Sequence, residues 1–483
     1  MAAKEFIVAI ELGSSKMTGI AGTKNLDGSI NVLAVVKENS SSFIHKGVVY
    51  NIDRTAQCLS NIVKKLTMQL KTEITQVYVG VGGQSIRSLR NVITKNLAME
   101  TKVTQDMVIE LMDANRNMSY PDQEILDAAV QEYKVDNQYQ MDPVGIQCKK
   151  LEGNFLNILG RKTFYNNLNR CFETAGVAIA EMYLAPLALA DSVLTEAEKR
   201  SGCALVDIGS DTVTVSVYSK NVLRHLSVLP LGSGNITKDI ASLQIEENEA
   251  EKMKLKYGSA YTDNADIDNT LMLPIDQERK IESHKFIEIV ESRLEEIIEN
   301  VLHQIPTEYT DKLLGGIILT GGGSNMKNIE KAFANHAHID KIRIAKFVTQ
   351  TVTSNNPEIT ARNGMMNTVL GLLAKGDMNC AGGSATDGDL FTAAKQPAAA
   401  AERTKARQAI ETPTGVVRTE AEKQQAEEEA RRKREEEERI ARERAEEEER
   451  KRREERKKKS LFYKCVNGLK RLGETMTKEE TDN

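Results

Sequence analysis

Residues 8–17 read Val-Ala-Ile-Glu-Leu-Gly-Ser-Ser-Lys-Met, and residues 205–214 read Leu-Val-Asp-Ile-Gly-Ser-Asp-Thr-Val-Thr. In both stretches a carboxylate near the end of an apolar strand is followed two residues later by glycine and then by hydroxyl side chains. Glycine permits a tight turn whose N–H groups can bond phosphate oxygens, and the carboxylate can hold a hydrated Mg²⁺. Two such hairpins facing each other predict a clamp for a triphosphate.

A third glycine-rich segment, Ile-Ile-Leu-Thr-Gly-Gly-Gly-Ser-Asn at residues 317–325, follows an apolar run and precedes a helical pattern. Glycines in this position let the backbone approach a ligand closely. Each of the three patterns alone is common in ordinary turns, whereas all three in this order favour a site for ATP with Mg²⁺. We expect Glu11 and Asp207 to hold the metal through water. The remaining nucleotide contacts are expected from Gly13, Ser14, Ser15, Lys16, Gly209, Ser210, Thr212, Gly321, Gly322 and Gly323.

The sequence around these turns alternates β-rich runs with helical patterns over residues 4–375, which is typical of an α/β fold. Because single cores stop growing at roughly 250 to 300 residues, a chain of 483 residues should form several lobes. The patterns predict strands at 6–12, 77–81, 204–208, 212–218 and 316–319. They predict helices at 51–70, 283–305 and 328–337.

Composition excludes several classes of function. The net charge of −5 gives no global field for a polyanion, so we expect no nucleic-acid partner. The six cysteines form no CxxC pair and no cluster with metal-ligand spacing, which indicates reduced thiols. We see neither a signal peptide nor an apolar run of the about 20 residues that a membrane-spanning helix needs. A cytoplasmic protein is expected.

The order of the three glycine turns resembles the phosphate-1, phosphate-2 and adenosine motifs of the actin, sugar kinase and Hsp70 superfamily. Within it, residues 5–375 and the C-terminus resemble the FtsA family of bacterial cell-division proteins. Residues 230–240 and 250–258, which carry Ala-Glu-x-x-Lys, support this resemblance. It implies that Glu251 and Lys254 lie near the adenosine, although the residues alone favour a surface ion pair at i, i+3.

The resemblance implies an actin-like two-lobed ATPase fold with an inserted subdomain of the type called 1C, suggested by residues 133–152. That subdomain would contact other division proteins and neighbouring copies of the chain. The expected divisions are 1–82 and 163–200 for the first lobe, 83–162 for the insertion and 201–375 for the second lobe.

Two departures from the superfamily pattern affect the expected chemistry. Glu11 stands where Asp is usual, which adds one methylene but should keep Mg²⁺ binding. Ala185 and Leu187 occupy a crossover segment where relatives carry a group that positions the attacking water, and neither side chain can orient water. We therefore expect at most slow ATP hydrolysis.

The predicted helix at 283–305 is amphipathic, with Phe286 and Ile297 on its apolar face. A core-packed helix with a solvated charged face is the simplest interpretation. In the FtsA family the corresponding helix receives the C-terminal tail of the tubulin-like protein FtsZ. The resemblance makes Arg293 the best candidate for reading that tail.

The amino-acid composition of the chain changes after residue 375. Small and polar residues dominate 376–418, which predicts a disordered linker. Between residues 420 and 459, 32 of 40 residues are charged, and many Glu residues precede an Arg by four positions, so 419–459 should form a solvated single helix rather than a coiled coil.

The final segment, residues 460–473, predicts a short amphipathic helix. Eleven basic and two acidic residues between 450 and 471 would attract an anionic leaflet. The expected membrane contacts are Leu461, Phe462, Cys465, Val466, Leu469 and Leu472.

Together these features predict a filament-forming adaptor that binds ATP and tethers the FtsZ ring to the cytoplasmic face of the membrane at the division septum. A small-molecule kinase or chaperone ATPase is the alternative of another class. Against it, residues 376–483 cannot form a β-rich substrate domain, and no catalytic base is evident. A pilus-assembly actin homologue is the nearer alternative, but it would not require the basic amphipathic tail.

Overall fold

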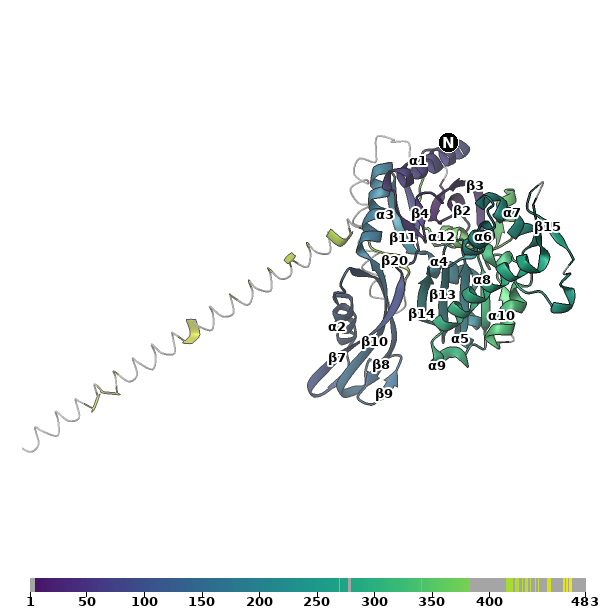
Figure 1. Cartoon of the computed structure of the whole chain (residues 1–483). Helices are drawn as coiled ribbons and strands as arrows, with labels where there is room; N and C mark the ends of the chain where they lie inside the picture. The colour runs from purple at the N-terminus through teal and green to yellow at the C-terminus, as the bar shows by residue number, and fades with distance from the viewer. Residues whose placement is uncertain are drawn as a thin grey trace, which may run out of the picture. The chain divides into compact units, whose positions relative to one another are not determined.

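The computed structural model describes residues 5–382 except 269, 277, 278 and 340, then residues 414–419 and scattered positions from 422 to 470. Residues 1–419 form one compact unit and residues 420–483 a second. The first unit holds two α/β lobes and an inserted subdomain, as expected for an actin-like chain with an insertion (Figure 1).

The first lobe is built on a seven-stranded sheet in the order β19-β3-β2-β1-β6-β11-β20. The central strands are mostly buried, and β1 pairs with β2 antiparallel and with β6 parallel. Its strands are β1 Ile7–Leu12, β2 Lys16–Lys24, β3 Ile30–Asn39, β6 Gln76–Val81, β11 Ala178–Leu184, β19 Val352–Thr353 and β20 Val416–Val417. Its helices are α1 Ile52–Leu70, α3 Lys162–Ala175, α4 Ala185–Val193, α11 Pro357–Thr360 and α12 Asn367–Lys375, with a small hairpin of β4 Ile44–His45 and β5 Val48–Val49.

The second lobe contains the strands β18-β17-β12-β13-β14 of a nine-stranded sheet, with α8 packed against them. The strands are β12 Cys203–Ile208, β13 Val213–Ser219, β14 Val222–Leu229, β17 Gly316–Thr320 and β18 Ile342–Ile344, with a separate hairpin of β15 Met272–Pro274 and β16 Lys280–Glu282. The helices are α5 Glu196–Ser201, α6 Ser233–Ala241, α7 Glu247–Tyr257, α8 Ser283–Gln304, α9 Thr307–Thr310 and α10 Ile329–Ala337, with 3-10 turns η1 Asn264–Asp266 and η2 Gly322–Asn325.

The inserted subdomain continues the second lobe's sheet in the order β7-β10-β8-β9. It has its own apolar core, in which α2 packs against β7 and β10. Its junction with β14 includes the register pair of Ser227 with Arg87, supported by the Leu226 N–H donating to Ser88 Oγ at 2.8 Å. The elements are β7 Arg87–Lys102, α2 Gln105–Arg116, β8 Gln123–Val135, β9 Gln138–Gln140 and β10 Gln147–Arg161.

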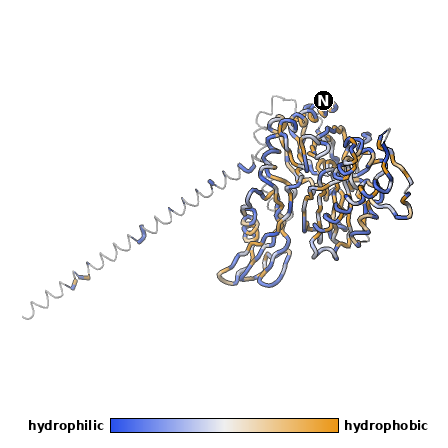
Figure 2. The backbone as a smooth tube through the Cα atoms, viewed as in Figure 1, coloured by the Kyte–Doolittle hydropathy of each residue, from blue (hydrophilic) through white to orange (hydrophobic). Residues whose placement is uncertain are grey.

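The strands and helices predicted between residues 4 and 375 agree with the observed ones to within one residue at each end. Local signals explain this agreement. Asn51 caps α1 by accepting the N–H of Arg54, and Lys71 ends that helix in the left-handed conformation. Apolar residues lie along the strands, in agreement with the burial of the sheets (Figure 2).

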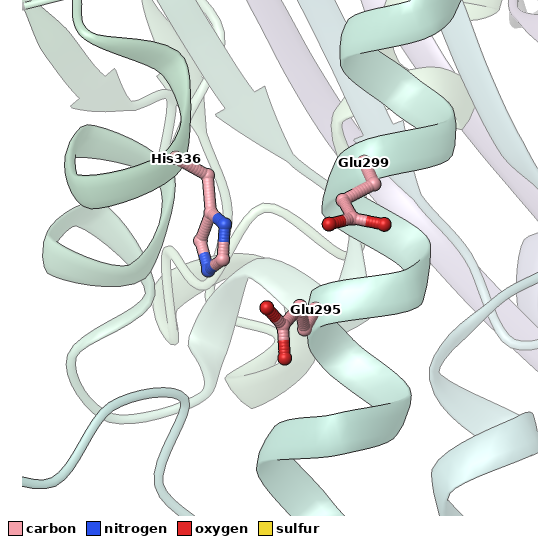
Figure 3. A group of neighbouring side chains, drawn as sticks. All are labelled: Glu295, Glu299 and His336. Atoms are coloured by element: carbon pink, nitrogen blue, oxygen red, sulfur yellow. The ribbon is translucent and has the colours of Figure 1, made fainter.

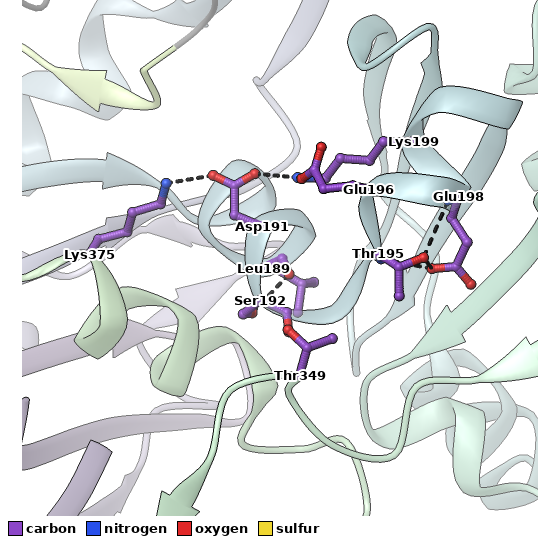
Figure 4. A network of polar contacts seen from close by, with 9 residues as sticks. All are labelled: Leu189, Asp191, Ser192, Thr195, Glu196, Glu198, Lys199, Thr349 and Lys375. Carbon is purple, nitrogen blue, oxygen red and sulfur yellow. Dashed lines mark hydrogen bonds and ion pairs between the residues drawn. The ribbon is translucent and has the colours of Figure 1, made fainter. Parts of the chain in front are cut away.

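Two helices, α4 and α12, pack together where the chain passes between the lobes. A side chain at Gly371 of α12 would collide with the backbone oxygen of Ala188 in α4, so glycine permits this close crossing. Nearby, Asp191 accepts from Lys199 Nζ at 2.8 Å and from Lys375 Nζ at 2.5 Å (Figure 4). A single carboxylate therefore ties α4 to α5 and to the end of α12.

The structure differs from the expected disordered linker at both ends of residues 376–418. At the start, the Cys380 N–H donates to Phe6 O at 2.8 Å, which joins this part to β1. At the end, residues 416–417 form β20 on the edge of the first lobe's sheet. Composition did not reveal either contact, because each depends on a partner far away in sequence.

The second unit is described only at scattered positions, and those between 422 and 470 are helical. Glu428 and Arg432 form one of the predicted i, i+4 pairs, with 3.0 Å between Oε1 and Nη2. None of the helices in the described part of the chain combines the length and the apolar character needed to span a bilayer.

Candidate functional site

Two of the predicted glycine turns connect antiparallel strand pairs. The β1–β2 ladder ends at Leu12 and Met17, which leaves residues 13–16 between these paired residues as the first turn. The β12–β13 ladder ends at Ile208 and Val213, and the Gly209 N–H donates to Thr212 O at 2.9 Å across the second turn. Both turns are thus short hairpin ends with hydroxyl residues at their tips.

The third turn lies directly beside the second because β12 pairs in parallel with β17, with Asp207 opposite Thr320. Gly321 has φ of +82°, and a Cβ there would overlap Asp207 Oδ1 and the Ile208 backbone oxygen. Only glycine fits this position. The glycine loop and the Asp207 carboxylate consequently share one edge of the second lobe.

One loop of the first lobe touches both hairpin turns. The Gly47 N–H donates to Ser14 Oγ at 2.8 Å, and the Lys46 N–H donates to Asp211 Oδ2 at 3.3 Å. These two hydrogen bonds bring the first turn, which belongs to the first lobe, close to the second turn, which belongs to the second lobe.

Glu11 and Asp207 are half-buried carboxylates close enough to affect each other. Loss of solvation and the negative charge of Asp207 together raise the pKa of Glu11 to about 8, against the opposing effect of Lys37. Burial also raises the pKa of Asp207 to about 6. Two half-buried carboxylates that repel each other are a donor set suited to a hydrated divalent cation. These residues therefore fit the Mg²⁺ ligands expected from the sequence.

Glu251 and Lys254 form the expected ion pair, with 2.7 Å between Oε2 and Nζ. The expected surface position is wrong for Lys254, which is only 6% exposed. Its ammonium donates to Ser233 O at 3.1 Å and to Thr237 Oγ1 at 2.8 Å. Next to Ser233, the Gly234 N–H donates to Ser210 O at 2.7 Å, so Lys254 supports the second turn from behind.

Helix α8 buries the predicted apolar face, including Phe286 and Ile297, in the second lobe's core. Arg293 on this helix is already paired within the chain. Its Nε and Nη2 contact the two oxygens of Asp239 in α6 at 2.5 and 3.1 Å, and its Nη1 contacts Glu296. Sequence inspection missed Asp239, because 54 residues separate it from Arg293.

One further side-chain group on α8 carried no sequence signal. Glu295 and Glu299, one turn apart, point toward His336 of α10, and their ligand atoms lie within 4.8 Å of one another (Figure 3). The glutamates are exposed, and exposed acidic groups often come together without a metal. We assign no metal site to them.

The crossover residues Ala185 and Leu187 lie at the start of α4. The Leu187 side chain is buried in the first lobe's core. Of the predicted membrane contacts, Val466 and Leu469 are described, and they are 40% and 70% exposed. The other four, Leu461, Phe462, Cys465 and Leu472, lie outside the described residues.

Comparison with known proteins identifies the family. The family model described as cell division protein FtsA matches residues 204–371, and that of the SHS2 domain inserted in FtsA matches residues 83–159. The chain is 34% identical to cell division protein FtsA of Porphyromonas gingivalis over 326 residues, covering 66% of this chain and 68% of that one. It is 32% identical to the Neisseria meningitidis FtsA over 334 residues, covering 68% and 80%. The chain belongs to the FtsA family.

Membership of the FtsA family confirms the expected role in cell division and identifies the inserted subdomain as the SHS2 domain of FtsA. Among solved structures, the PilM-PilN type IV pilus biogenesis complex resembles the chain with a TM-score of 0.54 at 15% identity, covering 76% of this chain and 97% of that one. At this identity the resemblance concerns the fold alone. The FtsA matches therefore favour the division role over the pilus-assembly alternative.

Proposed function

We propose that this FtsA-family protein binds ATP with Mg²⁺ between its two lobes, assembles into filaments and tethers FtsZ to the cytoplasmic face of the membrane at the division septum. The convergence of three glycine turns near the Glu11 and Asp207 carboxylates carries the nucleotide part of this proposal. The amphipathic sequence at 460–473 supports the membrane part.

Each turn has its own role in the proposed nucleotide site. Glu11 and Asp207 would hold hydrated Mg²⁺, which neutralises phosphate charge when bound. The backbone and hydroxyls of Ser14, Ser15, Ser210 and Thr212 would face the phosphates, together with Gly13, Lys16 and Gly209. Gly321, Gly322 and Gly323 would leave room for the adenosine. Lys254 and Glu251 act indirectly, by fixing the residues behind Ser210.

Slow hydrolysis is part of the same proposal. The crossover segment offers Ala185 and Leu187, which have no polar side-chain atom, where a water-positioning group would be needed. The nucleotide would then act mainly as a structural ligand that holds the two lobes together. Such a ligand stabilises the folded, two-lobed state by a free energy that rises with the logarithm of its concentration relative to its Kd.

Partner binding in the proposal uses three surfaces. Arg293 would read the C-terminal tail of FtsZ, and the tail would have to compete with Asp239 for the guanidinium. The SHS2 subdomain would contact other division proteins and neighbouring copies of the chain. The C-terminal helix would bind anionic lipids, and nucleic acid is not a proposed partner.

Gly322 offers the sharpest test of the nucleotide site. A Cβ at Gly321 or Gly323 would collide with Asp207 or Ile208 of β12, whereas at Gly322 it would meet only Met365 atoms at 3.7 Å, an ordinary contact. We expect Gly322→Ala to bind ATP–Mg²⁺ with an affinity close to that of the parent. Gly322→Phe should lose at least about tenfold in affinity, or about 1.4 kcal/mol, because its ring would enter the adenosine space.

Isothermal titration calorimetry on all three proteins would measure this difference, and thermal unfolding without nucleotide would show that each is folded. Equal affinities of the Phe variant and the parent would place the adenosine elsewhere.

A further inference from the structure

The C-terminal edge strand β20 is held on β11 by backbone hydrogen bonds. Val417 pairs with Met182 and Val416 with Tyr183 in antiparallel register. One residue beyond this ladder, the Leu184 N–H donates to Gly415 O at 2.6 Å. An exposed strand edge presents unpaired N–H and C=O groups that an extended peptide can satisfy. Residues 414–418, which we name the return segment, satisfy them here.

Side chains fix the register of the return segment. Val417 is only 1% exposed and belongs to the first lobe's core, and Val416 packs against the same core. Gly415 has φ of +73°, and a Cβ there would lie 3.3 Å from Leu187 Cβ. A side chain at residue 415 would thus be both strained and crowded. The β11 edge therefore accepts the sequence Gly-Val-Val in one register.

Polar contacts at both ends join the return segment to two parts of the molecule. At one end the Gly415 N–H donates to Asp127 Oδ2 at 2.8 Å. Asp127 is a buried carboxylate on β8 of the SHS2 subdomain and also accepts the N–H of Ala128. At the other end the Tyr165 hydroxyl of α3 donates to Arg418 O. The segment thus bridges the first lobe and the inserted subdomain.

The return segment is separated from the rest of the lobe by a long stretch of chain. Residues 383–413 number 31 and could span up to about 100 Å if extended. That length allows the strand to come from the same chain or from a neighbouring copy. Closing so long a connection carries an entropic cost that a few strand contacts must offset.

We propose that the β11 edge, together with Asp127, is a separable strand-binding site that recognises an extended Gly-Val-Val-Arg peptide, and that its resident ligand is the return segment of the same chain. Nucleotide and lipid are not needed for this interaction, so it stands apart from the function proposed above. When the return segment is released, the edge of β11 becomes available to another strand.

Substitution of Val417 tests whether the site is separable. We expect Val417→Asp, which places a charge in the first lobe's core, to release the return segment while the lobes stay folded. The Leu184 amide should then exchange with deuterium about tenfold faster or more, while the Val79 amide in central β6 should be unchanged. Val144→Asp, at an exposed valine in the SHS2 subdomain, is the matched control and should leave both rates at the parent value.

A peptide completes the test. A labelled peptide of residues 412–420 should bind the full-length Val417→Asp protein and restore slow exchange at Leu184, whereas the same peptide carrying the Asp substitution should not bind. Gly415→Val provides a second released variant should the first one misfold. If Leu184 stays protected in both released variants, or if neither accepts the peptide, the strand-binding site is refuted.

The source of the strand is tested by a disulfide. In protein carrying Tyr183→Cys and Val416→Cys, oxidation should give an intrachain bond at this non-hydrogen-bonded pair. A dimer on a non-reducing gel would overturn the assignment to the same chain and indicate strand exchange between copies.

Discussion

Single residues show why local sequence patterns find some functional groups and misjudge others. Glycines 321–323 were recognisable because three in a row after a strand are rare without a conformational reason. The burial of Lys254 and the pairing of Arg293 with Asp239 were not, because each depends on a partner brought in by tertiary packing. The sequence shows which side chains are charged, but only the fold shows which of these charges are paired with each other.

Glu198 shows how such a neutralised charge should affect stability. Burial alone would raise its pKa, but Arg343, at 2.6 and 2.9 Å, and the Thr195 N–H lower the pKa to about 2. Because the pKa is lower in the folded state, this group stabilises the fold above pH 4.5, and its contribution disappears as the pH falls toward 2.

The corresponding prediction concerns Glu198→Gln. It should lose about 1–3 kcal/mol of unfolding free energy at pH 7 and show a shallower decline between pH 4.5 and pH 2 than the parent. Glu196→Gln, on the same short helix but 78% exposed, should follow the parent curve. Urea unfolding at several pH values measures both effects, and parallel curves for parent and Glu198→Gln would contradict the assignment.

At the scale of elements, helices and strands were predictable where a periodic apolar pattern met a clear end signal. Helix α8 is an example: its apolar face and both ends follow from the sequence. Strand β20 is the opposite case, since two valines in a polar stretch carry no periodicity. Their strand conformation comes from the β11 edge that they cover.

Helix α8 also carries the prediction for the FtsZ tail. Arg293→Glu should weaken binding of an FtsZ tail peptide by at least about tenfold, because it reverses the charge that would read a carboxylate. Its affinity for ATP should not change. Asp239→Asn leaves Arg293 in place but removes its competing partner, so it should bind the peptide at least as tightly as the parent.

Fluorescence anisotropy with a labelled peptide distinguishes the two variants. Loss of both peptide and ATP binding in Arg293→Glu would mean that the α6–α8 ion pair is structural. Weaker peptide binding in Asp239→Asn would mean that the paired guanidinium, rather than the free one, forms the site.

For the whole molecule, the sequence predicted two lobes, an insertion and a separate tail, because each of these has a compositional or motif signature. It did not predict that the last described strand of the first lobe follows the long polar stretch. The proposed nucleotide site was predictable because its three glycine motifs and their order along the chain are visible in the sequence. The loop at Lys46 and Gly47 that joins two of these motifs has no such signature.

The proposed membrane attachment would depend on assembly of the protein into filaments. One amphipathic helix binds lipid reversibly, whereas many helices on one filament bind together. We expect Leu469→Glu to abolish flotation with anionic liposomes at physiological salt, and Glu447→Gln in the charged helix to have no effect. Continued flotation of the Leu469→Glu protein would place the anchor outside residues 460–473.

The position of β20 in the chain has a consequence for synthesis on the ribosome. Val417 pairs with Met182, a residue made 235 positions earlier. At about 5–20 residues per second, the edge of β11 remains unpaired for about 12 to 47 seconds in every newly made copy. During that interval the nascent chain carries an open edge that other proteins could reach. The edge closes only after residues 416–417 have left the ribosome, so this sheet is completed late in synthesis, long after its other strands have been made.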